Sequence, residues 1–276
     1  VLLLEAGEAR QNDFWITTPI GIGKILHNEN YIWPSKTLSQ QNLNGQEIYW
    51  PHGKMIGGSS SVNGMLHVRG EPAEFDYWLE KGNQGWGYEE LLPYFKKLEQ
   101  VEFNNDQTRG QTGPIKVTHL SRTPDPLSEA FINACIDTGI PANPDYNGIN
   151  YEGVGYLQTS IHKGQRCGTA AAYLNVSPKN LVIRTGAHVK RILFSDRRAT
   201  GVEYICKSQS YQVSARSEVL LCAGPIKSPQ LLELSGIGDA ERLKSLGIPI
   251  IFNSPQVGEN LIDHLQSRLN FVCSQP

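Results

Sequence analysis

The 276-residue sequence has no long hydrophobic run. None approaches the length of about 18 residues that a membrane-spanning helix requires, so no membrane span is expected. Nor is there an excess of charge of either sign, because 25 Lys and Arg residues face 27 Asp and Glu residues, for a formal net charge of −2. Nucleic acids and anionic membranes attract basic surfaces. The balanced composition therefore predicts that neither is a partner.

Metal-binding and disulfide patterns are also missing. The five cysteines are widely spaced without a CxxC pair, and no two of the seven histidines stand three or four residues apart. Zinc sites and dense disulfide frameworks require such spacings, so we expect no metal site. The sequence shows no initiator Met and no signal peptide, and it begins within a strand-like run, Val1 to Leu4. We interpret it as a fragment, which leaves the localisation unknown.

What the sequence does contain is an unusual glycine-rich stretch, GKMIGGSSSVNG, at residues 53–64. Glycine loses much backbone freedom on folding, so such a stretch indicates a place where something approaches the backbone closely. The N–H groups of Gly58, Ser59 and Ser60 are expected to form a concavity suited to phosphate. A solvated Gly/Ser linker is the alternative. It is disfavoured because apolar residues are interspersed in and just after the stretch: Met55, Ile56, Val62 and Met65.

A second candidate lies at the start of the chain. Val1 to Leu4 has the composition of a fully buried parallel strand, and it is followed by Glu5 and Gly7. In dinucleotide-binding folds an acidic residue at the end of a strand binds the ribose hydroxyls. An ordinary strand terminus remains the alternative, because the GxGxxG motif expected upstream is not in the sequence.

Periodicity predicts the remaining elements. Helices are expected over 71–81, over 88–101 with an interruption near Pro93, and over 127–138, with Phe131, Ile132 and Cys135 facing inward. A short helix is expected over 59–66. From residue 181 the pattern changes to period two and predicts an antiparallel meander that returns to a buried strand at 218–224. A helix should then begin with Ser228 as N-cap and end at Gly236, followed by a helix capped by Asp239.

Two long segments carry a resemblance to a known family. Residues 53–70 resemble the first signature of the glucose–methanol–choline (GMC) family of FAD oxidoreductases, and GPIKSPQLLELSGIG at 224–238 resembles the second. VLLLEAG at the start, AHVKRI at 187–192 and VGENLIDHL at 257–265 are further similar pieces. The whole chain is most similar to the insect glucose-dehydrogenase-like branch.

The resemblance implies a fold class and a domain plan. The fold expected is α/β: an FAD-binding dinucleotide fold with an antiparallel meander insertion plus part of an α+β substrate domain, truncated at both ends. The plan assigns an FAD-binding domain, a cofactor lid, a flavin-contacting intermediate region and a partial substrate domain. The corresponding ranges are 1–27 with 181–272, then 28–52, then 53–112 with 156–180, and finally 113–155 with 273–276.

The resemblance also implies which residues contact the cofactor. Glu5 would bind the adenosine ribose, Val189 would offer its backbone to adenine, and Asp263 would help close the site. Some family members attach the flavin to a histidine at the position that Val62 occupies here, so noncovalent FAD is implied. The remaining implied FAD contacts are Met55, Gly57, Gly58, Ser59, Asn63, Gly64, Met65, Leu66, Ala223 and Gly224.

The implied activity is the oxidation of a CH–OH group in an alcohol or sugar, with hydride transfer to the flavin and a quinone or oxygen as acceptor. No catalytic residue is assigned, because the family keeps its catalytic histidine in a C-terminal segment that no motif here matches. Arg166 is interpreted as a loop charge, with a substrate-side contact as the alternative. A nicotinamide-dependent dehydrogenase also fits Glu5 but needs no second glycine-rich turn. A non-catalytic relative remains the other alternative.

Overall fold

The structure is a computed structural model that describes residues 1–103, 107–174, 179–264, 270 and 272. The chain divides into two compact units, Val1–Gly186 and Ala187–Pro276. Each unit has its own sheets and helices, and each is described separately below.

The first unit begins with the strand β1, Leu2–Leu4, which pairs in parallel with β9, Val182–Arg184. The prediction of a parallel strand is thus confirmed. The prediction that it is fully buried is wrong, because Leu2 is 37% exposed. A ribbon of two strands covers neither of its faces completely, and this explains the exposure.

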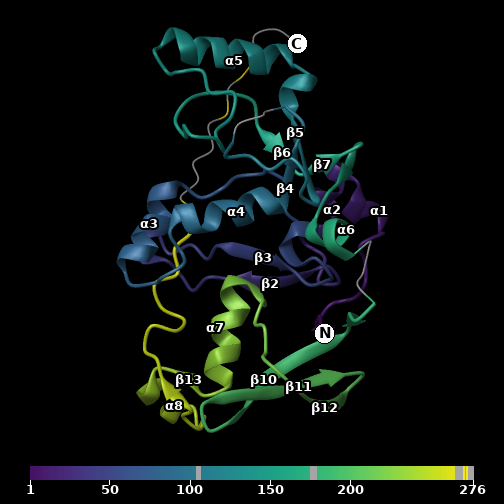
Figure 1. The fold of residues 1–276 in the computed structure, drawn as a ribbon, viewed down its shortest axis with the longest axis vertical. Helices are drawn as coiled ribbons and strands as arrows, with labels where there is room; N and C mark the ends of the chain where they lie inside the picture. The colour runs from purple at the N-terminus through teal and green to yellow at the C-terminus, as the bar shows by residue number, and fades with distance from the viewer. Residues whose placement is uncertain (104–106, 175–178, 265–269, 271, 273–276) are drawn as a thin grey trace. The chain divides into compact units, whose positions relative to one another are not determined.

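Short elements occupy the region between Glu5 and the glycine-rich stretch, which has no clear period in the sequence. These are α1 (Phe14–Thr17), η1 (Pro19–Gly21), α2 (Ile22–Ile25), β2 (Ile32–Lys36), η2 (Gln41–Leu43) and β3 (Tyr49–Gly53). β2 and β3 pair as an antiparallel hairpin (Figure 1). A buried apolar cluster joins these elements to the glycine-rich stretch: Ile16, Ile25, Tyr31, Ile32, Met55 and Val62.

Two of the predicted helices follow, as α3 (Pro72–Glu80) and α4 (Tyr88–Leu98). Pro93 lies inside α4 without interrupting it, so the predicted interruption is wrong. Proline has no N–H, so the helix forgoes the hydrogen bond that this position would have donated. It also ends earlier than expected, because Glu99–Val101 forms the strand β4, which pairs in parallel with β5 (Ile115–His119).

Several of the remaining elements of the first unit contact β5, namely β6 (Gln158–Thr159), β7 (Ile161–His162) and α6 (Thr169–Leu174). β5 pairs antiparallel with β6 and buries Ile115 and Val117. The predicted helix over 127–138 is α5 (Pro126–Asp137), but Phe131 is 60% exposed and therefore does not face inward. The remaining elements are η4 (Leu120–Arg122) and β8 (Gln165–Arg166).

The second unit contains the predicted meander. Its antiparallel strands are β10 (Ala187–Ser195), β11 (Arg198–Cys206) and β12 (Gln209–Ser214). α7 (Gly224–Leu234) packs beside β10, as Figure 1 shows. The N–H of Ile192 donates to Oγ of Ser235, just after α7, at 2.8 Å. Next come β13 (Ile237–Gly238), paired in parallel with β14 (Phe252–Asn253), and α8 (Ala240–Ser245).

Two predictions fail in this unit. Residues 218–224 do not form a strand, because no described segment pairs with them; Leu220 is 72% exposed. The helix expected with Ser228 as N-cap has Ala223 as its N-cap instead, five residues earlier, and begins at Gly224. Ser228 accepts a hydrogen bond from the N–H of Ala223 from within the helix. The cap at Asp239 is confirmed, since its carboxylate accepts from the N–H of Arg242 at 2.8 Å.

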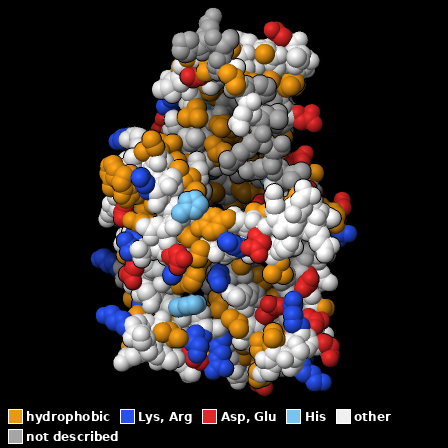
Figure 2. All heavy atoms as spheres, turned by 180° about the vertical axis from the view of Figure 1, so that it is seen from behind, with side chains coloured by type: hydrophobic (Ala, Val, Ile, Leu, Met, Phe, Trp, Pro, Cys, Tyr) orange, Lys and Arg blue, Asp and Glu red, His pale blue; other side chains and the backbone are white. Residues whose placement is uncertain are grey.

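Acidic and basic side chains are interspersed on the face shown in Figure 2, and apolar side chains lie between them. Among the described residues, no helix combines the length and apolar character needed to cross a bilayer. Within the same residues, no group of three or more His, Cys, Asp or Glu side chains is placed to hold a metal ion.

Candidate functional site

The glycine-rich stretch forms a turn that is tightly packed on one side. Gly57 and Gly58 have left-handed φ angles of 91° and 52°. A Cβ atom on Gly57 would lie 2.5 Å from Oγ of Ser61, so packing excludes a side chain there. A Cβ atom on Gly58 would meet nothing within 4 Å. The backbone at Gly58 therefore faces open space on the side where a side chain would stand, and a flat ligand can approach it.

The segment after this turn differs from the sequence prediction. Only Gly58–Ser61 is helical, as the short η3, so the helix expected over 59–66 is wrong beyond Ser61. The predicted three-amide concavity is wrong at Gly58, whose N–H donates to the carbonyl of Met55 at 2.9 Å. The hydroxyl of Ser59 accepts from the N–H of Gly53 at 3.1 Å and ties the two ends of the turn together.

The second turn, residues 63–66, presents one polar side chain, one apolar side chain and the backbone of a glycine. Asn63, Gly64 and Leu66 are exposed, whereas the side chains of Met55 and Met65 are buried. Met65 has a φ of 63°, and its N–H donates to Oδ1 of Asn63 at 3.1 Å. Met55 and Met65 are 0% and 6% exposed, so neither methionine side chain offers surface to a ligand.

The structure brings the end of β1 to the glycine-rich stretch. Glu8 forms a parallel bridge with Met55, and a Cβ atom on Gly7 would lie 1.8 Å from the carbonyl oxygen of Lys54. Oε1 of Glu5 accepts from the N–H of Gly7 at 2.8 Å. Burial raises the pKa of Glu5, and backbone hydrogen bonds from Gly7 and Ala6 oppose that shift. Two predicted contact regions, about 50 residues apart in sequence, are thus neighbours.

The other predicted contacts lie in the second unit. Val189 pairs with Tyr204 between β10 and β11. Ala223 and Gly224 form the N-terminus of α7, where Gly224 has a φ of 81°. Asp263 is exposed, and its Oδ1 accepts from the N–H of His264 at 2.9 Å. That these residues share one ligand with Glu5 and the glycine-rich turn remains a prediction.

Arg166 is a residue of this region that the sequence interpretation missed. It is only 6% exposed, so the interpretation as a loop charge is wrong. Its Nη1 donates to Oδ1 and to the carbonyl oxygen of Asn63, both at 2.8 Å, and its Nε donates to the carbonyl of Ile16 at 3.0 Å. Nη2 is buried without a hydrogen-bond partner. Burial lowers the pKa of Arg166 to about 10.

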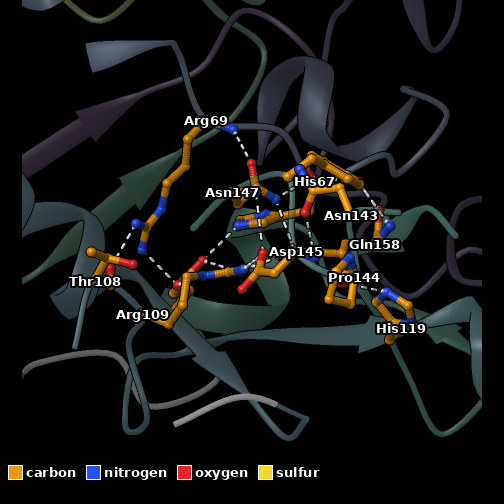
Figure 3. Close-up of polar contacts among 12 residues, drawn as sticks. His67, Arg69, Thr108, Arg109, His119, Asn143, Pro144, Asp145, Asn147 and Gln158 are labelled. Carbon is orange, nitrogen blue, oxygen red and sulfur yellow. Dashed lines mark hydrogen bonds and ion pairs between the residues drawn. The ribbon is translucent and has the colours of Figure 1, made fainter. Parts of the chain in front are cut away.

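A buried polar network holds the chain just beyond the second turn (Figure 3). Glu99 is fully buried and accepts from Nη2 of Arg69 at 2.6 Å and from Nε of Arg109 at 2.8 Å. The carboxylate also contacts Nε2 of His67 at 2.8 Å. Arg109 makes a further ion pair with Asp145.

The charge on Glu99 is strongly stabilised. Burial alone would raise the pKa of this carboxyl group, but hydrogen bonds from His67 and Arg109 and the charge of Arg109 outweigh it and lower the pKa to about 2. The carbonyl of His67 accepts from Nδ2 of Asn147 at 2.8 Å. His67 is thus held by both its side chain and its backbone, two residues after Met65.

Comparison with known proteins identifies the family. A family model described as GMC oxidoreductase matches residues 18–266. The chain belongs to the GMC oxidoreductase family. Human mitochondrial choline dehydrogenase is 41% identical to it over 284 residues, which span all of this chain and 48% of the human protein. An alcohol dehydrogenase [acceptor] from Pseudomonas putida is 40% identical over 99% of this chain and 50% of that protein.

Solved structures agree with this assignment. A pyridoxine 4-oxidase from Mesorbium loti has a TM-score of 0.86 and 33% identity over 93% of this chain and 50% of its own. An FAD-dependent oxidoreductase from Chaetomium thermophilum has a TM-score of 0.84 and 30% identity over 92% of this chain and 46% of its own. The chain spans about half the length of the curated relatives it matches.

These comparisons confirm the predicted family, the mixed α/β FAD-binding fold and FAD as the cofactor of that fold. Of the four proteins above, three are named as a choline dehydrogenase, an alcohol dehydrogenase and a pyridoxine 4-oxidase, the fourth is named only as an FAD-dependent oxidoreductase, and none is named as a glucose dehydrogenase. The assignment to an insect glucose-dehydrogenase-like branch therefore stays a prediction. The domain boundaries and the individual FAD contacts also stay predictions.

Proposed function

We propose that this chain is the FAD-binding part of an oxidoreductase that oxidises a CH–OH group of an alcohol or sugar. The observation that carries the proposal is the contact between the end of β1 and the glycine-rich turn, made by the Glu8–Met55 bridge. It sets an acidic side chain beside a stretch of backbone that has open space at Gly58. A dinucleotide needs both features, one for a ribose and one for the close approach of a flat or phosphorylated group.

Individual roles follow from the chemistry of each group. The carboxylate of Glu5 would accept hydrogen bonds from the ribose hydroxyls, as in other dinucleotide-binding folds. The backbone of residues 55–59 and the turn at 63–66 would lie against the pyrophosphate and flavin. In the second unit, the backbone of Val189 and of Ala223 and Gly224 would contact the adenine side, and Asp263 would help close the site.

Noncovalent binding is part of the proposal. Val62 occupies the position at which some family members carry a flavin-linked histidine, and it is 2% exposed within the apolar cluster around Met55. A side chain packed into that core has no path to a ligand on the surface of the turn. A valine also offers no nucleophile for a covalent bond.

When bound, FAD would supply the redox chemistry, as the acceptor for the hydride of the alcohol carbon. The residues of this chain bind and orient the cofactor, and none of them is assigned as the base that removes the hydroxyl proton. Relatives named choline dehydrogenase and alcohol dehydrogenase favour a small primary alcohol as the first substrate to test. A sugar remains a second class, and a quinone or oxygen is the proposed electron acceptor.

The site is tested by comparing Gly58→Ala with Gly82→Ala. Both glycines have left-handed φ angles, 52° and 95°, and a Cβ atom on either would meet nothing within 4 Å. Each substitution should therefore cost the FAD-free protein about 1 to 2 kcal/mol of unfolding free energy. Only Gly58→Ala should weaken FAD binding, by about tenfold or more, because its methyl group enters the space of the ligand. Equal FAD affinities for the two variants would refute the site.

The reaction class is tested on the flavin-loaded, full-length protein. Anaerobic mixing with choline, with simple primary alcohols and with glucose should bleach the flavin absorbance for at least one of them. A protein that binds FAD tightly but is reduced by no alcohol or sugar would instead support a non-catalytic relative.

A further inference from the structure

Arg166 imposes one orientation on the side chain of Asn63. Nη1 of Arg166 lies 2.8 Å from Oδ1 of Asn63, and the N–H of Met65 donates to the same oxygen at 3.1 Å. A guanidinium group and a backbone N–H are donors only. If the carboxamide were flipped, its NH₂ group would face two donors, so the oxygen must point toward Arg166 and Met65.

The other half of the carboxamide is left free to bind a ligand. Nδ2 of Asn63 donates to no group in the part of the chain that the structure describes, and Asn63 is exposed. Two hydrogen-bond donors therefore remain at the surface of the second turn. Their direction is set by Arg166, a residue 103 positions away in the sequence.

The surroundings of Arg166 indicate that it does more than fill space in the core. Its guanidinium contacts the carbonyl oxygens of Ile16, Ser60 and Asn63, which are all neutral. No carboxylate of the described ranges lies within ion-pair distance of it, and Nη2 is buried without a partner. A buried, unpaired cation is costly. A neutral side chain would fill the same space at lower cost, whereas a group with donors alone is needed to fix the carboxamide.

We infer that Arg166 is a positioning residue for the cofactor: it holds the Asn63 carboxamide so that Nδ2 donates a hydrogen bond to an acceptor atom of bound FAD. The inference rests on the proposed function, because it takes FAD to be the ligand of the second turn. Arg166 does not itself touch the cofactor in this account. It acts through Asn63.

The test compares FAD dissociation constants and FAD-free melting temperatures of variants of the full-length protein. Arg166→Lys keeps a side chain that only donates, whereas Arg166→Gln can also accept and so permits the flipped carboxamide. We expect Arg166→Gln to weaken FAD binding about tenfold and Arg166→Lys to restore most of the affinity. Arg122→Gln is the matched control, because Arg122 is exposed and pairs with Glu102 on the surface; its FAD affinity should not change.

Asn63→Asp tests the same contact with Arg166 in place. The carboxylate still accepts from Arg166 and Met65 but has no N–H to donate. The melting temperature should therefore hold or rise, while FAD binding weakens about tenfold. The double variant of Arg166→Gln with Asn63→Asp should bind FAD no more weakly than Asn63→Asp alone, because the two changes remove the same hydrogen bond to FAD.

Three results would overturn the inference: unchanged affinity in Arg166→Gln, additive losses in the double variant, or a fully retained FAD affinity in Asn63→Asp. If Arg166→Gln does not fold, the Asn63→Asp result still decides. Failure of the wild-type protein to bind FAD would instead refute the proposed function.

Discussion

The buried carboxylate of Glu99 allows a quantitative prediction for Glu99→Gln. The change removes a negative charge that faces Arg69, Arg109 and His67 inside the first unit. The two arginines stay buried, and only Arg109 retains a carboxylate partner, Asp145. Removing one member of a buried ion pair costs about 3 to 5 kcal/mol.

The pKa of Glu99 gives an independent magnitude. Its decrease from 4.5 to about 2 corresponds to about 3 kcal/mol of stability at neutral pH. Because the folded-state pKa is the lower one, this contribution is fully present above pH 4.5. It is lost as the pH falls toward 2, and about 2 kcal/mol of it is gone by pH 3.

Urea unfolding of the wild type and of Glu99→Gln at pH 7 and pH 3 measures both effects. We expect Glu99→Gln to lower the free energy of unfolding by about 3 kcal/mol at pH 7 and by clearly less at pH 3. Glu102→Gln is the control, since it breaks only the exposed ion pair with Arg122 and should cost below about 1 kcal/mol. A Glu99→Gln loss at pH 7 no larger than that of the control would refute the reasoning, as would a loss independent of pH.

Three further predictions concern single positions. Glu5→Gln should raise the unfolding free energy of the FAD-free protein at pH 7, because burial raises the pKa of Glu5 and stability is lost as the pH rises through that pKa and the buried carboxyl group ionises. FAD affinity should nevertheless fall, and a titration that shows no fall contradicts the ribose role. Gly57→Ala should lower the free energy of unfolding, measured by thermal denaturation, by about 2 kcal/mol or more, since a Cβ there meets Ser61 at 2.5 Å in a left-handed backbone. A loss equal to that of Gly58→Ala would contradict this prediction. Asp239→Ala should lower the free energy of unfolding by about 1 kcal/mol, because it removes the N-cap of α8, and it should leave FAD affinity unchanged. An unchanged urea midpoint would contradict the stabilising role of the cap.

Local sequence signals predicted the elements whose stability is mostly local. The meander from 187 to 214 follows from alternating residues, and α8 begins at Ala240 because the side chain of Asp239 caps the helix. The helix over 126–137 follows from its apolar spacing. In each case the hydrogen bonds that form the element join residues close together in the sequence.

Predictions failed where a distant partner decides the structure. The run at 218–224 has the composition of a buried strand, but a strand needs a neighbour to pair with, and none of the described residues provides one. Glu99 was assigned to the end of a helix, whereas pairing of β4 with β5 makes it the start of a strand. Composition alone does not show such pairings.

In the candidate site, too, local sequence signals located some residues, whereas a residue that depends on distant partners was missed. Glycine content located the turn at 57–58, and a strand end located Glu5. Arg166 was missed because its role depends on Asn63 and Ile16, which lie more than 100 residues away. A single arginine in a two-residue strand carries no sequence signal of its burial.

The central claim is that one FAD binds across the turns at Gly58 and Asn63. The most direct measurement is the visible absorption spectrum of the purified full-length protein, followed by titration of its flavin-free form with FAD. The account predicts a flavin spectrum and saturation at one FAD per chain. A colourless protein that takes up no added FAD would contradict it.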